Sequence, residues 1–253
     1  MLPAAFLRLP IAHRAYHDKA AGRPENTLGA VKAAVEAGYA IEIDVQLSAD
    51  GKAMVFHDDT LERLTGHEGL VRSRTAAELA QMKVLGSDET VPDLPQVLTA
   101  VGGKVPLVIE IKDQSLCMGP VDGRLEAAVA EALKGYEGPV AVMSFNPASM
   151  AHMARLAPDV PRGITTCSYQ EDEWDPLDPD LRADLAAIGQ YEAVGASFIS
   201  HHHVDLANPR VAELKAKGAG LICWTIRSLA DEENARKLAD NVTFEHYPAP
   251  FQA

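Results

Sequence analysis

The stretch AIEIDVQLSADGKAMVFH, residues 40–57, decides the fold of this chain. It begins as a short apolar run in which two acidic residues, Glu42 and Asp44, alternate with hydrophobic ones. Because side chains two residues apart on a strand point to the same side, both carboxylates share one face of a strand predicted over 40–45. Unpaired carboxylates in a core are costly, so this face is expected to meet other polar groups at the interior or mouth of a barrel.

The same stretch predicts a hairpin after this strand. The dipeptide Asp50-Gly51 is a strong signal for a two-residue turn. A tight turn, continued along the register, places Asp44 opposite His57 with Cβ atoms about 5 Å apart. We therefore expect His57 to return to the side of the carboxylates.

Outward from this stretch, short apolar runs alternate with longer Ala-rich amphipathic stretches along the whole chain. Such alternation implies parallel strands joined by helical crossovers. The number of candidate strands indicates a closed TIM (β/α)8 barrel, a fold that commonly uses about 250 residues as one domain. Residues 1–253 are therefore predicted to form a single α/β domain. The predicted strands are 8–13, 40–45, 105–111, 139–143, 161–165, 196–199, 220–225 and 241–244, and the predicted helices are 26–37, 93–101, 122–135, 147–156, 180–193, 208–217 and 229–239.

Two segments break the alternation. Residues 46–90 hold the hairpin and then a polar, irregular insertion after the second strand, and residues 166–180 are acidic and contain proline. Both segments follow predicted strands, so both are expected at the C-terminal mouth of the barrel, where TIM-barrel active sites lie.

Composition excludes some function classes. The 253 residues carry a formal net charge of −13, which argues against general binding of nucleic acid or an anionic membrane. The three cysteines are widely spaced, which suits a reducing compartment and gives no zinc signature. No signal peptide or transmembrane helix is expected, so we predict a cytoplasmic protein without stable membrane association.

Charged residues gather at the ends of the predicted strands. Glu110 and Lys112 end the third strand and, being two apart, face the same way. Glu110 then joins Glu42 and Asp44 in a group of three converging carboxylates. This oxygen-rich set suits one divalent cation, Mg²⁺ or Ca²⁺, with Mn²⁺ also possible.

His13 and Arg14 end the first strand, at the same mouth. His13 and His57 can serve as an acid and a base. Arg14 and Lys112 can hold a phosphate, Arg14 through its planar fork and Lys112 as a point charge. The collection fits a phosphodiester better than a neutral substrate.

These residues fall into a pattern that resembles the core of the glycerophosphodiester phosphodiesterases. The matching segment is HRAYHDKAAGRPENTLGAVKAAVEAGYAIEIDVQLSADGKAMVFHDDTLERLTG, residues 13–66. Its motifs are His-Arg at 13–14, Pro-Glu-Asn-Thr at 24–27, Glu-x-Asp at 42–44 and His-Asp at 57–58, and Glu-x-Lys follows at 110–112, in the order that is specific to that family. Weaker similarity continues through 144–147, 198–200 and 223–226 and covers nearly the whole chain.

The resemblance implies a hydrolase of glycerol and lipid metabolism whose partner is a small-molecule glycerophosphodiester. Its products would be sn-glycerol 3-phosphate and an alcohol, with an internal attack by a glycerol hydroxyl, through a cyclic phosphate, left open. The implied roles are metal binding for Glu42, Asp44 and Glu110, acid/base catalysis for His13 and His57, and phosphate binding for Arg14 and Lys112.

Three positions depart from the family pattern. Ala15 stands where glycine is usual, Arg227 follows the Trp-Thr strand where asparagine is frequent, and residues 242–248, VTFEHYP, replace a more usual Thr-Asp-x-Pro ending. The extra bulk of Ala15, or a changed backbone angle there, could reshape the phosphate pocket.

Lower-ranked residues are weighed against ordinary structural roles. Glu25 and Asn26 are expected to support the mouth from behind. Trp224 is a candidate contact for the glycerol or alcohol group, with core packing as the competing interpretation. Of the run of histidines at 201–203, at most one is expected to reach the mouth, and a polar loop is favoured.

Two other functions stay open. A related barrel phosphodiesterase acting on lysophospholipids would need an apolar lip near 60–90 or 166–180, and both stretches are largely polar. A catalytically inactive barrel could bind a phosphodiester without cleaving it, although such a protein has no need of an acid/base pair. The sequence leaves the alcohol group and the oligomeric state open.

Overall fold

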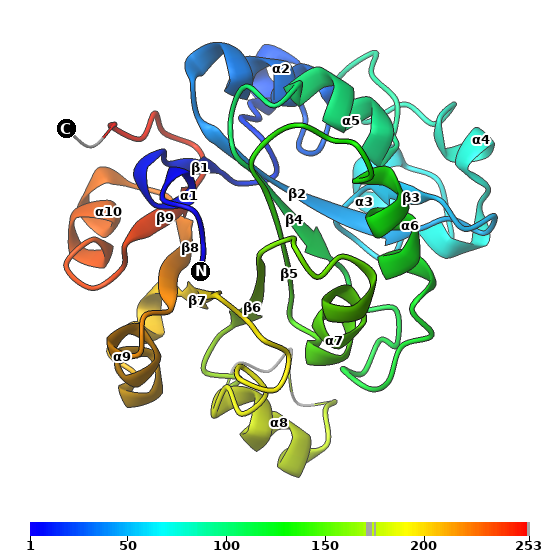
Figure 1. Cartoon of the computed structure of the whole chain (residues 1–253). Helices are drawn as coiled ribbons and strands as arrows, with labels where there is room; N and C mark the ends of the chain where they lie inside the picture. Colours follow the sequence, from blue (N-terminus) through cyan, green and yellow to red (C-terminus); the bar gives the residue numbers. More distant parts are fainter. Residues whose placement is uncertain (171–173, 175, 252–253) are drawn as a thin grey trace.

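The computed structural model describes residues 1–170, 174 and 176–251, and its parallel strands close into a barrel (Figure 1). The first strand pairs with both the second and the last, which closes the ring. This arrangement confirms the predicted TIM barrel. The barrel strands are β1 (Ile11–Ala12), β2 (Ala40–Leu47), β4 (Leu107–Ile111), β5 (Val140–Ser144), β6 (Arg162–Thr166), β7 (Phe198–His202), β8 (Gly220–Ile226) and β9 (Asn241–Phe244).

Helices surround the ring of strands (Figure 1). Most of the longer ones begin at a Ser, Thr, Asp or Asn whose side chain accepts a hydrogen bond from the first turn, which is the residue chemistry that favours helix starts. The longer helices are α2 (Leu28–Ala37), α5 (Leu94–Val101), α6 (Arg124–Ala132), α7 (Pro147–Leu156), α8 (Pro179–Ala186), α9 (Pro209–Ala216) and α10 (Leu229–Ala235). The short ones are α1 (Ala5–Arg8), α3 (Glu62–Thr65), α4 (Ala76–Leu79), η1 (Lys19–Ala21), η2 (Val71–Ser73) and η4 (His203–Asp205).

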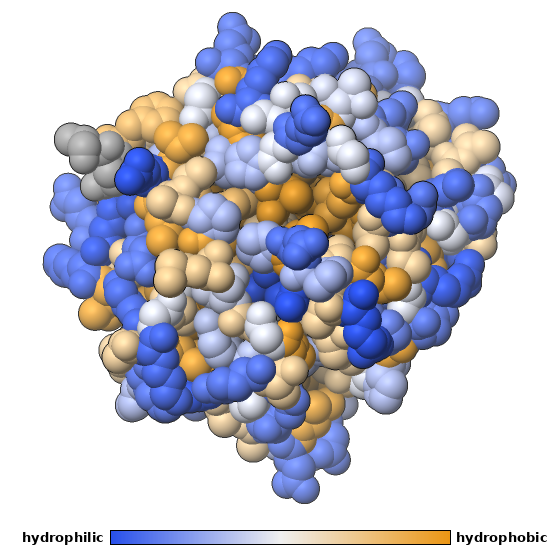
Figure 2. Space-filling view, in the orientation of Figure 1, coloured by the Kyte–Doolittle hydropathy of each residue, from blue (hydrophilic) through white to orange (hydrophobic). Residues whose placement is uncertain are grey.

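The N-terminal segment differs from the prediction. The predicted strand 8–13 is a strand only over Ile11–Ala12, and the preceding residues form α1 instead. Phe6 of α1 is fully buried and packs with interior residues of the barrel such as Phe198. This helix therefore helps to fill the end of the barrel opposite the predicted site. Figure 2 shows hydrophobic side chains in the hollows near the middle of the viewed face and hydrophilic ones around its edge.

The predicted hairpin exists, but the observed pairing differs from the predicted register by one residue, so the prediction of the register was wrong. Strand β3 (Ala53–Val55) pairs antiparallel with β2, and Ser48 N donates to Lys52 O across a loop of three residues with Gly51 at a φ of 80°. A three-residue loop with glycine in the left-handed region is the next most common solution after the two-residue turn. As a result, Asp44 lies opposite Phe56, whose backbone N donates to Asp44 O, and His57 follows one position later.

The insertion is more ordered than its polar sequence indicates. Strand β3 and helices α3 and α4 enclose a separate small apolar cluster, which explains why this segment keeps a fixed shape beside the barrel. Its buried members are Met54, Phe56, Leu61, Leu64, Val71, Leu79, Val84 and Val91. Of the second irregular segment, 166–180, residues 171–173 and 175 lie outside the described part of the chain.

None of the helices formed by the described residues is both long and apolar enough to cross a membrane.

Candidate active site

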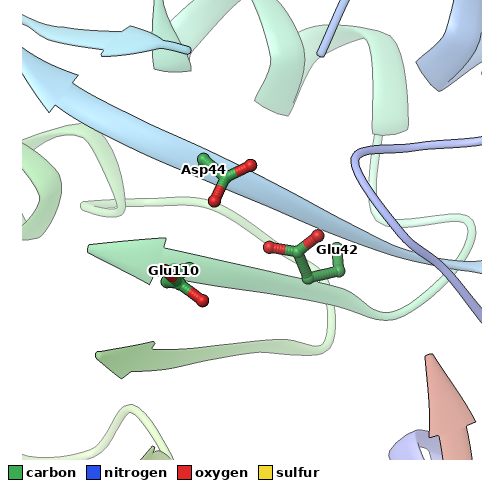
Figure 3. Close-up of side chains that lie close together, drawn as sticks. All are labelled: Glu42, Asp44 and Glu110. Atoms are coloured by element: carbon green, nitrogen blue, oxygen red, sulfur yellow. The ribbon is translucent and has the colours of Figure 1, made fainter. Parts of the chain in front are cut away.

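Three buried carboxylates meet at the C-terminal ends of β2 and β4. Asp44 pairs directly with Glu110 in the parallel register, and Glu42 lies two residues earlier on the same face of β2. One oxygen from each of the three lies within 4.8 Å of the others. Figure 3 shows the three side chains directed to the same region between the two strands. The structure thus brings the three predicted metal ligands together.

Hydrogen bonds from neighbouring groups orient two of these carboxylates. Glu42 Oε2 accepts a hydrogen bond of 2.8 Å from the backbone N of Arg14. Asp44 Oδ2 accepts a hydrogen bond of 2.9 Å from Asn26 Nδ2, while the Asp44 backbone N donates to Asn26 Oδ1. Asn26 therefore contacts Asp44 from behind the cluster, while the other oxygen of Asp44, Oδ1, lies 3.5 Å from Lys112 Nζ.

The electrostatics of the cluster favour a bound cation. Burial, followed by repulsion from Asp44 and Glu110, raises the pKa of Glu42 well above its usual range. Burial opposes ionisation of Asp44 too, but the charges of His57, Lys112 and Arg14 hold its pKa far below the usual range. A divalent cation coordinated by all three would relieve the repulsion that Glu42 experiences, and oxygen donors are those that Mg²⁺ and Ca²⁺ prefer. The donor set therefore fits the predicted metal.

The two predicted phosphate-binding cations flank the cluster. Lys112 Nζ lies 2.8 Å from Glu110 Oε1 and 3.5 Å from Asp44 Oδ1, and these carboxylates raise the pKa of Lys112 despite its burial. Arg14 Nη1 donates to Glu25 Oε1 at 2.8 Å, and Arg14 Nε lies 3.8 Å from Asp44 Oδ2. Both cations are thus fixed by carboxylates before any phosphate is bound.

His13 is held by a carboxylate from the other end of the chain. Ala12 pairs with Phe244, so the next residues, His13 and Glu245, lie side by side at the barrel mouth. His13 Nδ1 is 2.7 Å from Glu245 Oε2, and Arg227 Nε donates to Glu245 Oε1 at 2.7 Å. Burial lowers the pKa of His13, although the hydrogen bond to Glu245 opposes this shift.

His57 has a similar arrangement built from nearby residues. Its Nδ1 lies 2.7 Å from Oδ1 of the adjacent Asp58, and Arg63 Nε donates to Asp58 Oδ2 at 2.6 Å. Arg63 also donates to both oxygens of Glu25. Glu25 therefore links Arg14 and Arg63, which places it behind the site as expected. In both histidines Nδ1 is engaged and Nε2 is left for chemistry.

The candidate residues surround one cavity of about 140 Å³ at the barrel mouth. His57 belongs to its lining even though the register that was predicted to bring it there is wrong. Trp224 borders the cavity and also packs against the small buried cluster of Cys167, Tyr169 and Leu185, so it combines a place at the cavity with core packing. The lining residues are His13, Arg14, Glu42, Asp44, His57, Glu110, Lys112, Met143, Phe145, Thr165, Ser200, Trp224, Thr225, Arg227 and Thr243.

A larger cavity of about 590 Å³ lies beyond Glu25, and it contains neither of the candidate histidines and none of the three clustered carboxylates. We assign the chemistry to the smaller cavity because the acid, base and metal candidates converge there.

Sequence reasoning missed the role of Glu245. Residues 242–248 stand out as a departure from the family pattern, and this was the available signal, but contact with His13 joins residues 232 positions apart. The histidine run at 201–203 is also partly different from expectation. His201 is a buried strand residue that contacts Thr166 and Asp205, rather than part of a polar loop.

Comparison with known proteins points to one family. The profile of the glycerophosphoryl diester phosphodiesterase family matches residues 13–243. The chain is 30% identical over 239 residues to a glycerophosphodiester phosphodiesterase of Caldanaerobacter subterraneus subsp. tengcongensis, and the match covers 90% of each chain.

Solved structures agree. One similar structure is an Oleispira antarctica phosphodiesterase in complex with the product sn-glycerol-3-phosphate, at 27% identity and a TM-score of 0.73, covering 95% of this chain and 94% of that one. A glycerophosphodiester phosphodiesterase from Thermotoga maritima, 23% identical, shares the fold with a TM-score of 0.69 over 93% of this chain and 94% of that one.

Proposed function

The chain belongs to the glycerophosphoryl diester phosphodiesterase family and is a phosphoric diester hydrolase, and from this premise we propose how it acts. The reaction is the hydrolysis of glycerophosphodiesters to sn-glycerol 3-phosphate and an alcohol. It takes place in the cavity between His13 and His57, with one divalent cation bound by Glu42, Asp44 and Glu110.

One observation carries this proposal. Two histidines, each with Nδ1 held by a carboxylate, border the same cavity as three buried carboxylates that lie within 4.8 Å of one another. Carboxylates bound to Nδ1 fix the tautomer of a histidine, so that Nε2 is presented to the substrate. In such an arrangement one histidine can accept a proton and the other can donate one, beside a site for a phosphate.

His13 is the better candidate for the base. Its lowered pKa favours the neutral imidazole, which can accept through Nε2 a proton from the water whose oxygen forms the new bond to phosphorus. The developing imidazolium is then stabilised by Glu245. As the bond between phosphorus and the alcohol oxygen breaks, His57 donates a proton to that oxygen.

Arg14 and Lys112 bind the phosphoryl oxygens. Both cations border the cavity and are already oriented by carboxylates, which reduces the reorganisation needed when substrate binds. Glu42, Asp44 and Glu110 would hold a divalent cation, which when bound would supply Lewis-acid stabilisation of the negative charge on the phosphate.

The test is an assay of glycerophosphocholine and glycerophosphoethanolamine in which released sn-glycerol 3-phosphate is oxidised by its dehydrogenase. We expect EDTA to abolish turnover and Mg²⁺ or Ca²⁺ to restore it. We also expect Glu42→Gln to remove most turnover, because Glu42 is one of the three clustered carboxylates that would hold the cation.

The control variants come from the surface of the same protein. Glu233→Gln changes an exposed glutamate of α10, and His67→Ala changes an exposed histidine of the insertion. Both should retain full turnover. A folded protein that binds glycerophosphocholine but does not cleave it with any divalent cation would contradict the proposal and support the inactive, phosphodiester-binding barrel.

A further inference from the structure

A second cavity, of about 420 Å³, continues outward from the candidate active site. The two cavities adjoin, because both are lined by Arg14, His57, Glu110, Lys112, Phe145 and Trp224. The outer part, which we call the apolar groove, has walls formed by Leu116, Met118, Phe145, Trp174 and Trp224, and Asp59 and Asp113 also border this cavity. A substrate whose phosphate lies at Arg14 and Lys112 can therefore extend into this groove.

The wall of the apolar groove is anchored from behind. The Phe145 ring centroid lies 5.4 Å from that of Trp174 and 5.5 Å from that of Trp224. These rings and Met118 pack against a small buried cluster that includes Tyr169. The wall is thus a fixed apolar surface, which can bury part of a ligand without first ordering itself.

The rim of the groove is held in an unfavourable backbone conformation. Leu116 and Met118 have φ angles of 62° and 55°, in the left-handed region that side chains rarely adopt. Asp113 holds this turn because its side chain accepts hydrogen bonds from the backbone N of Ser115 and of Met118 and from Asn146 Nδ2. Strain of this kind persists where the surrounding structure enforces it, often at ligand-binding sites.

The rim of the groove leaves apolar surface exposed that a hydrocarbon chain in the groove would cover. Leu116 is 51% exposed although it borders a groove whose other apolar members are largely covered. The glycerol and the small alcohol of a deacylated glycerophosphodiester are polar and gain little from this surface. A hydrocarbon chain that leaves the phosphate site along the groove would cover Leu116 and Met118 and bury apolar area.

We propose that the apolar groove binds the aliphatic chain of a lysophospholipid, a glycerophosphodiester that carries one acyl chain on its glycerol. This inference rests on the proposed function because it uses the same phosphate site. Trp174 supplies part of this apolar surface from within 166–180, one of the two segments where the lysophospholipid alternative needs an apolar lip. The groove is built largely by the loop after β4 and by Phe145 after β5.

The first test is turnover of a homologous series at constant head group. Glycerophosphocholine is compared with its butanoyl, hexanoyl and octanoyl 1-acyl derivatives, all kept below the concentration at which they form micelles. Release of choline is the readout, because the acylated products escape the glycerol 3-phosphate dehydrogenase. A fully buried methylene is worth about fourfold and a half-buried one about twofold, so we expect kcat/KM to rise about twofold for each added methylene. A flat or falling series, with glycerophosphocholine still cleaved, overturns the groove while the proposed function stands.

A binding measurement separates the two proposals if nothing is cleaved. The chain has two tryptophans, Trp174 and Trp224, and both line the groove, so intrinsic fluorescence reports its occupancy directly. With EDTA present to prevent turnover, the half-saturating concentration should fall as the chain lengthens from butanoyl to octanoyl. Equal half-saturation across the series contradicts the inference whatever the catalytic result.

A matched pair of variants locates the effect. Leu116→Asn keeps a side chain that tolerates the left-handed region but removes the apolar surface at the rim. Leu156→Asn makes the same change at an exposed leucine that ends α7, where Leu156 is 45% exposed. We expect the ratio of kcat/KM for the octanoyl derivative to that for glycerophosphocholine to fall at least about threefold in Leu116→Asn and to stay unchanged in Leu156→Asn. Equal ratios in both variants would overturn the assignment of the groove.

Discussion

The two candidate histidines reach the same cavity with opposite kinds of support. His13 is 14% exposed and depends on Glu245, which arrives from β9 only because the barrel closes. His57 is 29% exposed and depends on Asp58, its own neighbour in the sequence. In each case an arginine binds the far side of the carboxylate.

This difference shows that one chemical arrangement can be made either by the whole fold or by a local turn. We expect the His13 half of the site, which comprises His13, Glu245 and Arg227, to be the more rigid one, and burial lowers the pKa of His13. The His57 half, which comprises His57, Asp58 and Arg63, can move with the insertion, because the small apolar cluster of the insertion is separate from that of the barrel.

The largest expected effect distinguishes the two halves by role. His13→Ala and His57→Ala should each lower kcat/KM for glycerophosphocholine about 10²–10⁴-fold, the usual contribution of a general acid or base. With a 4-nitrophenyl diester of glycerol 3-phosphate, the leaving group needs no proton. On that substrate His57→Ala should recover most of the loss, whereas His13→Ala should not. The reverse pattern would exchange the two roles.

Metal binding tests whether the carboxylate cluster works independently of the two histidines. Ca²⁺ or Mg²⁺ at about 100 times its Kd should raise the free energy of unfolding by about 2.7 kcal/mol. The stabilisation should disappear in Glu42→Gln and persist in both His13→Ala and His57→Ala, because neither histidine is a ligand. Thermal unfolding at several metal concentrations measures this. Loss of the metal effect in either histidine variant would show that the halves are not independent of the carboxylate cluster.

The Glu245→Gln substitution should weaken the His13 half selectively. We expect kcat/KM to fall about 10–100-fold, the range for groups that orient a functional histidine. Since Glu245 opposes the lowering of the pKa of His13, removing its charge should move the acidic limb of the kcat/KM profile to lower pH. Asp58→Asn is the matched control, and it should leave the position of that limb unchanged.

The same carboxylate should make stability depend on pH. Burial opposes ionisation of Glu245, but contacts with His13, His17 and Arg227 hold its pKa far below the usual range. Its contribution is therefore present above the unfolded pKa of about 4.3 and lost as the pH falls below it. Urea unfolding should show wild type more stable than Glu245→Gln by about 1.5–3 kcal/mol at pH 7, the range for charged hydrogen bonds. An equal gap at about pH 2–3 would contradict this explanation.

The smallest expected effect concerns backbone strain in the His13 half. Ala15 has a φ of 65°, a conformation that glycine adopts without a steric penalty. Its Cβ is buried, so Ala15→Gly loses a little apolar packing while it relieves the strain. We expect the free energy of unfolding to rise by up to about 1 kcal/mol, as measured by urea titration. A loss of more than that amount would mean that the packing of the Cβ outweighs the strain.

Much of the site could be predicted because it depends on short-range periodicity. The alternation along 40–45 places Glu42 and Asp44 on one face, and the pairing of neighbouring parallel strands brings Glu110 beside them. The order of strands and helices likewise follows from local apolar patterns, which explains why most predicted strands lie within a few residues of the observed ones. These features require no knowledge of contacts between distant segments.

The register of the hairpin was predicted incorrectly because a glycine signal fits two turns of different length. The dipeptide Asp50-Gly51 suits both, and the side chain of Ser48 helps to select the longer one by accepting a hydrogen bond from Lys52 N. A shift of one residue exchanges the faces of a strand. His57 still reaches the cavity because it lies beyond the end of β3, where the alternation no longer dictates its direction.

By itself, the sequence determined the barrel, the carboxylate cluster and the identity of the two histidines, because these follow from local periodicity and motif order. Only the tertiary structure decided that Glu245 supports His13, since that contact requires β9 to close the ring against β1. The apolar groove was likewise decided by the fold. Its residues come from separate loops at one end of the barrel, and the physical reason is that parallel strands bring their C-terminal ends together whatever their distance in sequence.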